Sequence, residues 1–133
     1  MALDITKPGI DIGVVTDHGA AMTAFYGETL GLDHVGEFKM GGGMVIQRYQ
    51  CGNSVVKVVV LPGEPPATAA PGGINGAAGF RYFTITVSDI AASIEACQQA
   101  GATIAVPVTE LRPGITIAMV EDPDGNWVEL LAG

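Results

Sequence analysis

The chain has 133 residues, of which 48% are hydrophobic and 15% are charged, and this composition is typical of a folded globular protein rather than a disordered one. The formal net charge is −8 and the six Lys and Arg residues are scattered, which argues against nucleic acid and against an anionic membrane surface as partners. No segment is apolar over enough residues to span a bilayer, and we see no signal peptide, so we expect a cytoplasmic protein. Cys51 and Cys97 have no CxxC spacing, and we expect them to be reduced thiols.

The first half of the chain predicts one strand, one helix and three further strands. The strands are expected at residues 10–16, 33–39, 44–50 and 55–61, and the helix at residues 19–30. Gly31 marks the end of the helix. Within 44–50, strand alternation puts Gln47 and Tyr49 on one face and Arg48 on the other, so only one of these faces can line a given surface.

A segment rich in Pro, Gly and Ala at residues 62–78 is predicted to be a linker, and the same order of elements begins again after it. The helix is expected at residues 88–101, with Ser88 or Asp89 as its N-cap. Its apolar stripe, at helical spacing, consists of Ile90, Ile94 and Cys97. The strands are expected at residues 80–87, 103–108, 115–121 and 127–131, with turns at 110–114 and 122–126. In the last strand, one face is expected to carry Trp127, Glu129 and Leu131, and the other Val128 and Leu130.

Both halves therefore have the order β-α-β-β-β, and their spacing indicates a duplication. Asp11 and Tyr82, in the two first strands, are 71 positions apart (11 to 82), and Lys57 and Glu129, in the two last strands, are 72 apart (57 to 129). We interpret residues 1–61 as the first module and residues 79–133 as the second, together making one structural domain.

Two segments resemble the vicinal oxygen chelate superfamily, which includes glyoxalase I, bleomycin-resistance proteins and extradiol dioxygenases. "DIGVVTDHGAAMTAFYGETLGL" is similar to the opening strand and helix of the family, and "DPDGNWVEL" is similar to its closing turn and strand. The resemblance implies an α+β fold in which two tandem β-α-β-β-β modules form a curved mixed sheet around a cleft. It also implies that four side chains face the cleft centre, where relatives usually hold a divalent metal, and here these are Asp11, Lys57, Tyr82 and Glu129.

These four residues depart from the usual ligand set. Only Glu129 keeps a usual ligand type. The Lys57 ammonium has no free lone pair and repels a cation, and a phenol such as that of Tyr82 is a poor ligand for most divalent ions. We therefore expect no cofactor, and Lys57 disfavours a divalent metal; if a metal binds, Glu129 and Asp11 are its expected ligands.

The Lys57 ammonium, between the carboxylates of Asp11 and Glu129, could take the place of the divalent metal ion. This arrangement has two interpretations: an ion triad that only stabilises the fold, or an acid/base group acting on a ligand in the cleft with Tyr82 as a hydrogen-bonding partner.

Four further residues are candidates for ligand binding. Gln47 and Tyr49 share a strand face that suits a polar aromatic ligand. Trp127 could pack in the core or provide a surface on which a ligand stacks. His34 could face the cleft or lie at the edge of the sheet.

The resemblance leaves three functions open. The first is a metal-independent, glyoxalase-like lyase or isomerase that acts by acid/base chemistry on a small organic molecule, such as an aromatic or polyketide-like one. The second is a non-catalytic protein that binds or sequesters a small drug-like compound, in the manner of bleomycin-resistance proteins. The third is a divalent-metal-dependent lyase or dioxygenase. A homodimer is also expected by resemblance.

Overall fold

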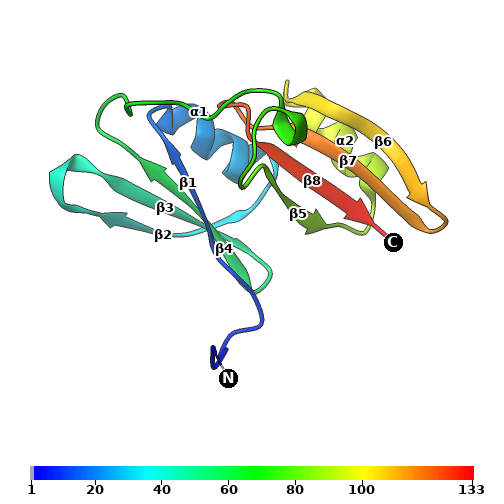
Figure 1. Cartoon of the computed structure of the whole chain (residues 1–133), viewed down its shortest axis with the longest axis horizontal. Coiled ribbons are helices and arrows are strands. Elements are labelled where there is room, and N and C mark those ends of the chain that lie inside the picture. The colour runs from blue at the N-terminus through cyan, green and yellow to red at the C-terminus, as the bar shows by residue number, and fades with distance from the viewer. Residues whose placement is uncertain (1) are drawn as a thin grey trace. The chain divides into compact units, whose positions relative to one another are not determined.

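The computed structural model describes residues 2–133 and divides the chain into two compact units that meet between Pro66 and Ala67 (Figure 1). This boundary lies inside the segment predicted to be a linker. None of the helices in the described range is long and apolar enough to cross a membrane.

The first unit is a four-stranded mixed sheet with one helix. Its strands have the order β1-β4-β3-β2, with β1 parallel to β4 and the other neighbours antiparallel. The elements along the chain are β1 (Ile12–Thr16), α1 (Gly19–Ala24), η1 (Phe25–Thr29), β2 (Asp33–Lys39), η2 (Gly41–Gly43), β3 (Val45–Cys51) and β4 (Ser54–Val60).

The second unit repeats this arrangement, with the strand order β5-β8-β7-β6 and β5 parallel to β8. Its elements are η3 (Gly73–Asn75), β5 (Tyr82–Thr86), α2 (Ile90–Gln99), β6 (Thr103–Arg112), β7 (Ile115–Glu121) and β8 (Trp127–Ala132). The predicted α+β fold of two β-α-β-β-β modules, each with a mixed sheet, is confirmed.

In the first unit, α1 and η1 lie directly on one face of the sheet. A Cβ atom added to Gly19 would lie 2.8 Å from Cγ1 of Val60, and one added to Gly27 would lie 2.9 Å from Cε1 of Tyr49. These glycines let the helix backbone approach the strands closely. The buried side chains of this unit are Met22, Phe25, Tyr26, Tyr49, Val55, Val56 and Val58, together with Thr16.

In the second unit, α2 buries the predicted apolar stripe of Ile90, Ile94 and Cys97. Its N-cap is Asp89, whose carboxylate accepts a hydrogen bond of 3.0 Å from the backbone N–H of Ala92. Val128 and Leu130 of β8 are buried on the helix-covered face, while their neighbours along β8 are only half-buried. The predicted alternation of this last strand is therefore confirmed.

Two predicted elements differ from the structure. The helix expected at 19–30 changes to a π-helix from Phe25 onwards, where the N–H of Leu30 donates to the carbonyl of Phe25 at 2.8 Å. The turn expected at 110–114 is wrong, because β6 continues to Arg112. This edge strand accommodates Pro107 with several register shifts, which is where proline is tolerated in a sheet.

Candidate functional site

Each sheet has one face that its own helix does not cover, which we call the open face. In the first unit, the pairing of neighbouring strands sets Gly13, Lys57 and Arg48 side by side in one row across β1, β4 and β3. The buried Val56 and Val58 flank Lys57 along β4 and point to the helix, so Lys57 points to the open face.

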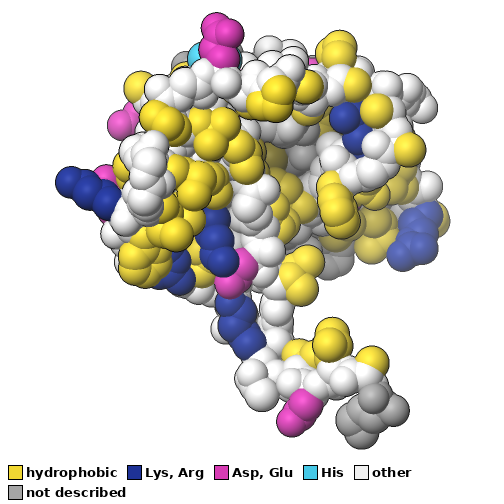
Figure 2. Space-filling view, turned by 60° about the vertical axis from the view of Figure 1, so that its left-hand side comes forward, with side chains coloured by type: hydrophobic (Ala, Val, Ile, Leu, Met, Phe, Trp, Pro, Cys, Tyr) yellow, Lys and Arg dark blue, Asp and Glu magenta, His cyan; other side chains and the backbone are white. Residues whose placement is uncertain are grey.

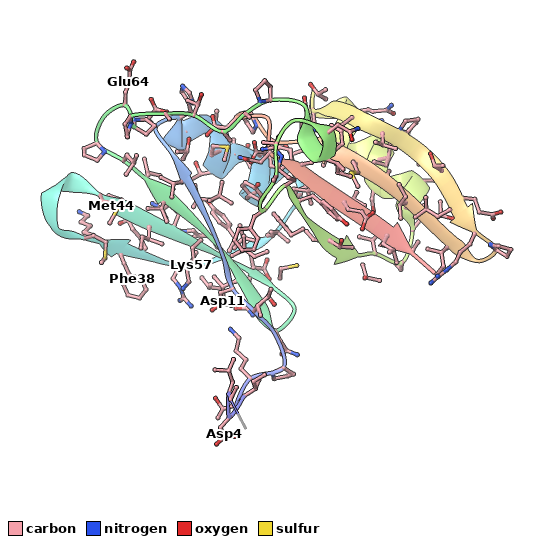
Figure 3. The ribbon with its side chains drawn as sticks, viewed as in Figure 1. Asp4, Asp11, Phe38, Met44, Lys57 and Glu64 are labelled. Carbon is pink, nitrogen blue, oxygen red and sulfur yellow. The ribbon has the colours of Figure 1, made fainter. Side chains whose placement is uncertain are left out.

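The open face of the first unit carries apolar side chains beside these cations. Val15 is 57% exposed and Phe38 is 53% exposed, and the Arg48 guanidinium carbon lies 5.6 Å from the centre of the Phe38 ring. Figure 3 shows Phe38, Lys57 and Asp11 on the side of the sheet away from α1. Figure 2 shows Lys and Arg side chains lying among apolar ones on the molecular surface.

Asp11 lies just before β1 and is already paired. Its Oδ1 accepts hydrogen bonds from Nζ of Lys7 at 2.7 Å and from the backbone N–H of Val55 at 2.8 Å. The bond from Lys7, then that from Val55, and to a smaller extent the charge of Lys57 hold the pKa of Asp11 below its ordinary value. The ion pair of Asp11 is therefore made with Lys7 and not with Lys57, which corrects the expected triad.

In the second unit, Glu129 lies on the open face, beside the position that pairs with it on β5. Its Oε1 accepts a hydrogen bond of 2.6 Å from the Thr84 hydroxyl, and the Cα atoms of these residues are partners in the parallel β5–β8 pair. Tyr82, Trp127 and Met119 point to the same face by strand alternation. Glu129 is thus a half-buried surface carboxylate with aromatic and apolar neighbours, and it is not a core residue.

Trp127 is held in place by the segment that precedes β5. Gly73 lies so close to the indole that an added Cβ would be 2.1 Å from Cε2 of Trp127. Arg81 holds this segment by donating from Nε to the carbonyl of Gly73 at 2.6 Å and from Nη2 to that of Ala70 at 2.7 Å. Nε1 of Trp127 donates to Glu121 at 3.0 Å. One part of the predicted linker is therefore a packed element of the second unit.

The turn before β8 decides which face Glu129 occupies. Oδ1 of Asp122, a residue that is 4% exposed, accepts from the backbone N–H groups of Asp124 and Asn126, each at 2.9 Å. The Asn126 side chain also donates to the Asp122 carboxylate, at 2.9 Å to Oδ2. This Asx-type turn, closed by Gly125 at a φ of 86°, fixes the register of the hairpin.

Three residues predicted to bind ligand lie elsewhere. Tyr49 pairs with Val56 and Gln47 pairs with Val58, so both belong to the helix-covered face of the first unit. His34 contacts both, with a hydrogen bond of 2.6 Å between Nε2 and Oε1 of Gln47 and an edge-on ring contact with Tyr49. These three residues therefore do not share a surface with Lys57.

The structure thus brings the predicted residues together in three groups. Asp11 and Lys57 share the open face of the first unit, and Tyr82, Glu129 and Trp127 share that of the second. His34, Gln47 and Tyr49 form the third group.

Sequence reasoning assigned no role to Thr84 or Arg48. No signal in the sequence marks them, because the register of the paired strands decides which residues lie beside Lys57 and Glu129.

The described residues contain no group of three or more His, Cys, Asp or Glu side chains arranged to hold a metal ion. Cys51 and Cys97 are both free, and burial raises the pKa of each thiol, which disfavours the reactive thiolate.

The comparison with protein families agrees with this geometry. The sequence model of the Glyoxalase/Bleomycin resistance protein/Dioxygenase superfamily matches residues 10–130. The chain belongs to this superfamily. The match includes both open faces, and the predicted family is therefore confirmed. No curated protein matches the chain.

Several solved structures have the same fold as this chain. A glyoxalase family protein from Bacillus cereus has a TM-score of 0.78 at 16% identity, over 98% of this chain and 97% of that one. The protein SMU.1112c has a TM-score of 0.76 at 21% identity, over 94% and 98% of the two chains. TioX from Micromonospora sp. ML1 has a TM-score of 0.66 at 19% identity, over 92% and 93%. At these identities the likeness shows the fold alone.

Proposed function

We propose that this superfamily member is a metal-independent lyase or isomerase that binds a small organic molecule on the open face of the second unit and transfers a proton through Glu129. Carboxylates are effective general acids and bases when they are positioned within hydrogen-bonding distance of the substrate. The small-molecule clefts of proteins combine apolar and aromatic walls with few polar groups, as on the open face of the second unit.

The placement of Glu129 carries this proposal. Thr84 donates to Oε1 at 2.6 Å, and this bond fixes the orientation of the carboxylate. Among residues 2–133, the hydrogen-bond partner of Glu129 is Thr84, which binds Oε1. Oε2 is therefore left to exchange a proton with the substrate. Tyr82, which is 48% exposed, offers a second polar group on the same face.

The side chains do not fit the divalent metal that relatives of this fold usually hold. Oδ1 of Asp11 is engaged by Lys7 and by the N–H of Val55. The Lys57 ammonium offers no lone pair, and a protonated Tyr82 is a poor ligand. The proposed proton transfer therefore involves neither a metal nor a cofactor.

Binding without conversion is the second candidate. The exposed Tyr82 and the half-buried Trp127 suit an aromatic ligand, and the net charge of −8 favours a cationic compound. A protein that only sequesters such a compound needs the aromatic side chains but has no need of the Glu129 carboxylate.

The experiment begins with identification by mass spectrometry of any small molecule that co-purifies with the chain. That compound is then incubated with the metal-free wild type, Glu129→Gln and Thr84→Val. We expect Glu129→Gln to lower turnover by about 10²–10⁴-fold while binding changes little. Glu110→Gln, an exposed carboxylate of β6, is the matched control and should keep full turnover.

Three results would contradict parts of this proposal. Recovery of the compound unchanged from the wild type favours the binding protein. Unchanged turnover in Glu129→Gln excludes the proposed role of the carboxylate. Turnover that depends on added divalent metal, checked by elemental analysis, supports the metal-dependent alternative. The expected homodimer is also part of the proposal and is tested by analytical ultracentrifugation.

A further inference from the structure

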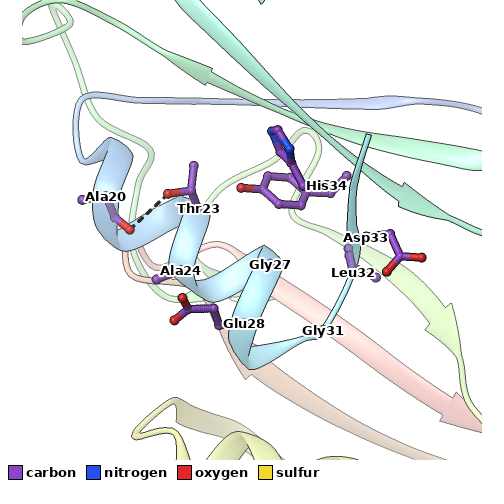
Figure 4. Close-up of a pocket in the computed structure, with 10 residues that line it drawn as sticks. Ala20, Thr23, Ala24, Gly27, Glu28, Gly31, Leu32, Asp33 and His34 are labelled. Atoms are coloured by element: carbon purple, nitrogen blue, oxygen red, sulfur yellow. Dashed lines mark hydrogen bonds between the residues drawn. The ribbon is translucent and has the colours of Figure 1, made fainter. Parts of the chain in front are cut away.

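A second concave site lies in the first unit, on the helix-covered side of the sheet. This pocket has a volume of about 530 Å³ and lies between the helical segment and the start of β2 (Figure 4). It is lined by Ala20, Thr23, Ala24, Gly27, Glu28, Gly31, Leu32, Asp33, His34 and Tyr49. Tyr49 and Lys57 point to opposite faces of the sheet, so this pocket is separate from the open face.

Small side chains create the hollow. Ala20, Ala24, Gly27 and Gly31 follow one another at helical spacing along one side of the segment, where larger residues would fill the space. At Gly27 an added Cβ would come within 2.9 Å of the Tyr49 ring. Tyr49 lines the pocket although this residue is only 5% exposed, so it forms the buried wall of the hollow.

Two aromatic rings are held rigidly at this wall. The rings of His34 and Tyr49 meet edge to face at 5.3 Å with an interplanar angle of 63°. Nε2 of Gln47 donates to Glu37 at 2.7 Å, so Oε1 of Gln47 is the acceptor for Nε2–H of His34 at 2.6 Å. This chain of hydrogen bonds fixes the His34 ring, and a ring fixed in advance loses little entropy when a ligand binds.

The charged groups that line the pocket include the carboxylates of Glu28 and Asp33 but no Lys or Arg. Burial raises the pKa of Tyr49, the hydrogen bond with Thr23 opposes this, and the charge of Glu28 raises the pKa further. The negative potential of Glu28 thus extends to the phenol. Figure 4 shows Glu28 on the helical segment and Asp33 and His34 on the strand side.

We propose that this pocket binds a small organic cation that carries an aromatic ring. The ring contacts Tyr49 and His34, and the cationic group lies near Glu28 and Asp33. An amine is attracted by the carboxylates and by the faces of the aromatic rings, whereas a carboxylate ligand is repelled by both. This site goes beyond the proposed proton transfer, because it uses none of the open-face residues.

Three probes separate the two recognition features. Benzylamine has the ring and the positive charge, benzoate has the ring with a negative charge, and cyclohexylmethylamine has the charge without an aromatic ring. Binding to the full chain is followed by NMR, through the ring signals of His34 and Tyr49 during titration. We expect benzylamine to bind about tenfold more tightly than benzoate and more tightly than cyclohexylmethylamine.

Two variants locate the site. Glu28→Gln should weaken benzylamine about fivefold, while Glu95→Gln, which removes the same charge from an exposed position of α2, should leave the affinity within twofold. Ala20→Leu fills the pocket rim and should abolish the ring-signal shifts. Equal binding of benzoate and benzylamine, or equal losses in Glu28→Gln and Glu95→Gln, would overturn the proposal.

Discussion

The two units place different chemistry at matching positions of the same fold. Across the first sheet, one row contains Gly13, Lys57 and Arg48; across the second, the matching row contains Thr84, Glu129 and Met119. The members of each matching pair are 71 or 72 positions apart in the sequence. One row is therefore cationic and the other is acidic.

This difference shows that the two units share backbone pairing and the direction of side chains, while their functional groups differ. In the second unit a hydroxyl lies beside the carboxylate and orients it. In the first unit the place of that hydroxyl is taken by Gly13, near which an added Cβ would meet nothing within 4 Å. Lys57 thus has a glycine beside it at the place where Glu129 has the Thr84 hydroxyl, which is why we propose proton transfer in the second unit.

The largest expected effect compares two glycines of the open faces. Gly73→Ala places a methyl group against the Trp127 indole at a residue with a φ of 56°, so we expect a loss of about 3–4 kcal/mol in unfolding free energy. Gly13→Ala enters open space at a strand residue and should change stability by less than about 0.5 kcal/mol. Chemical denaturation followed by Trp fluorescence measures both. Equal effects would mean that the segment around Gly73 does not pack on Trp127.

The hairpin turns of the two units should also respond differently. Asp122→Ala removes the acceptor for the N–H groups of Asp124 and Asn126, and we expect a loss of about 2–3 kcal/mol. Asn53→Ala, at the exposed turn between β3 and β4, should lose less than about 0.5 kcal/mol. Thermal unfolding of both variants tests the difference, and a loss below 1 kcal/mol for Asp122→Ala contradicts the structural role of this turn.

Helix capping distinguishes the units on a smaller scale. Asp89 caps α2 through its side chain, and Asp89→Ala should lower the unfolding free energy by about 1 kcal/mol. His18 makes no side-chain capping bond at the start of α1, so His18→Ala should have less than half this effect. Urea denaturation of the two variants in parallel provides the measurement, and the same loss in both would remove this distinction.

The smallest expected effect depends on pH. Asp11 has a pKa below its ordinary value of 3.8, so its carboxylate stabilises the folded chain above that pH and loses this contribution as the pH falls through the lowered pKa. We expect Asp11→Asn to be less stable than the wild type at neutral pH, with the difference vanishing in strong acid. Tyr82→Phe, at the matching position, removes no carboxylate and should show no such dependence. A constant difference between wild type and Asp11→Asn at every pH would contradict the assignment.

Local patterns in the sequence predicted much of this fold. The N-cap at Asp89, the apolar stripe of α2 and the alternation of β8 depend on neighbouring residues, and all three are observed. The π-helical turn after Ala24 and the long β6 were not predicted, because packing against the rest of the unit decides them.

The candidate site was predicted less completely. Alternation showed that Gln47 and Arg48 point to opposite faces but not which face the helix covers. That choice depends on Val56 and Val58, which pair with Tyr49 and Gln47 only once the sheet has formed. Asp11 pairs with Lys7 and not with the expected Lys57 for a similar reason, since nothing in the sequence indicates how the segment before β1 is oriented. The catalytic and ligand-binding roles stay predictions.

The Asp122 turn also determines the order in which the site can assemble. It joins strands that are adjacent in the sequence, and such a hairpin closes within microseconds because little chain entropy is lost. Thr84 lies 45 residues before Glu129, and contacts between such distant residues form late in folding. The hairpin thus orients the Glu129 carboxylate first. The Thr84 hydroxyl reaches this carboxylate only when β5 joins the sheet.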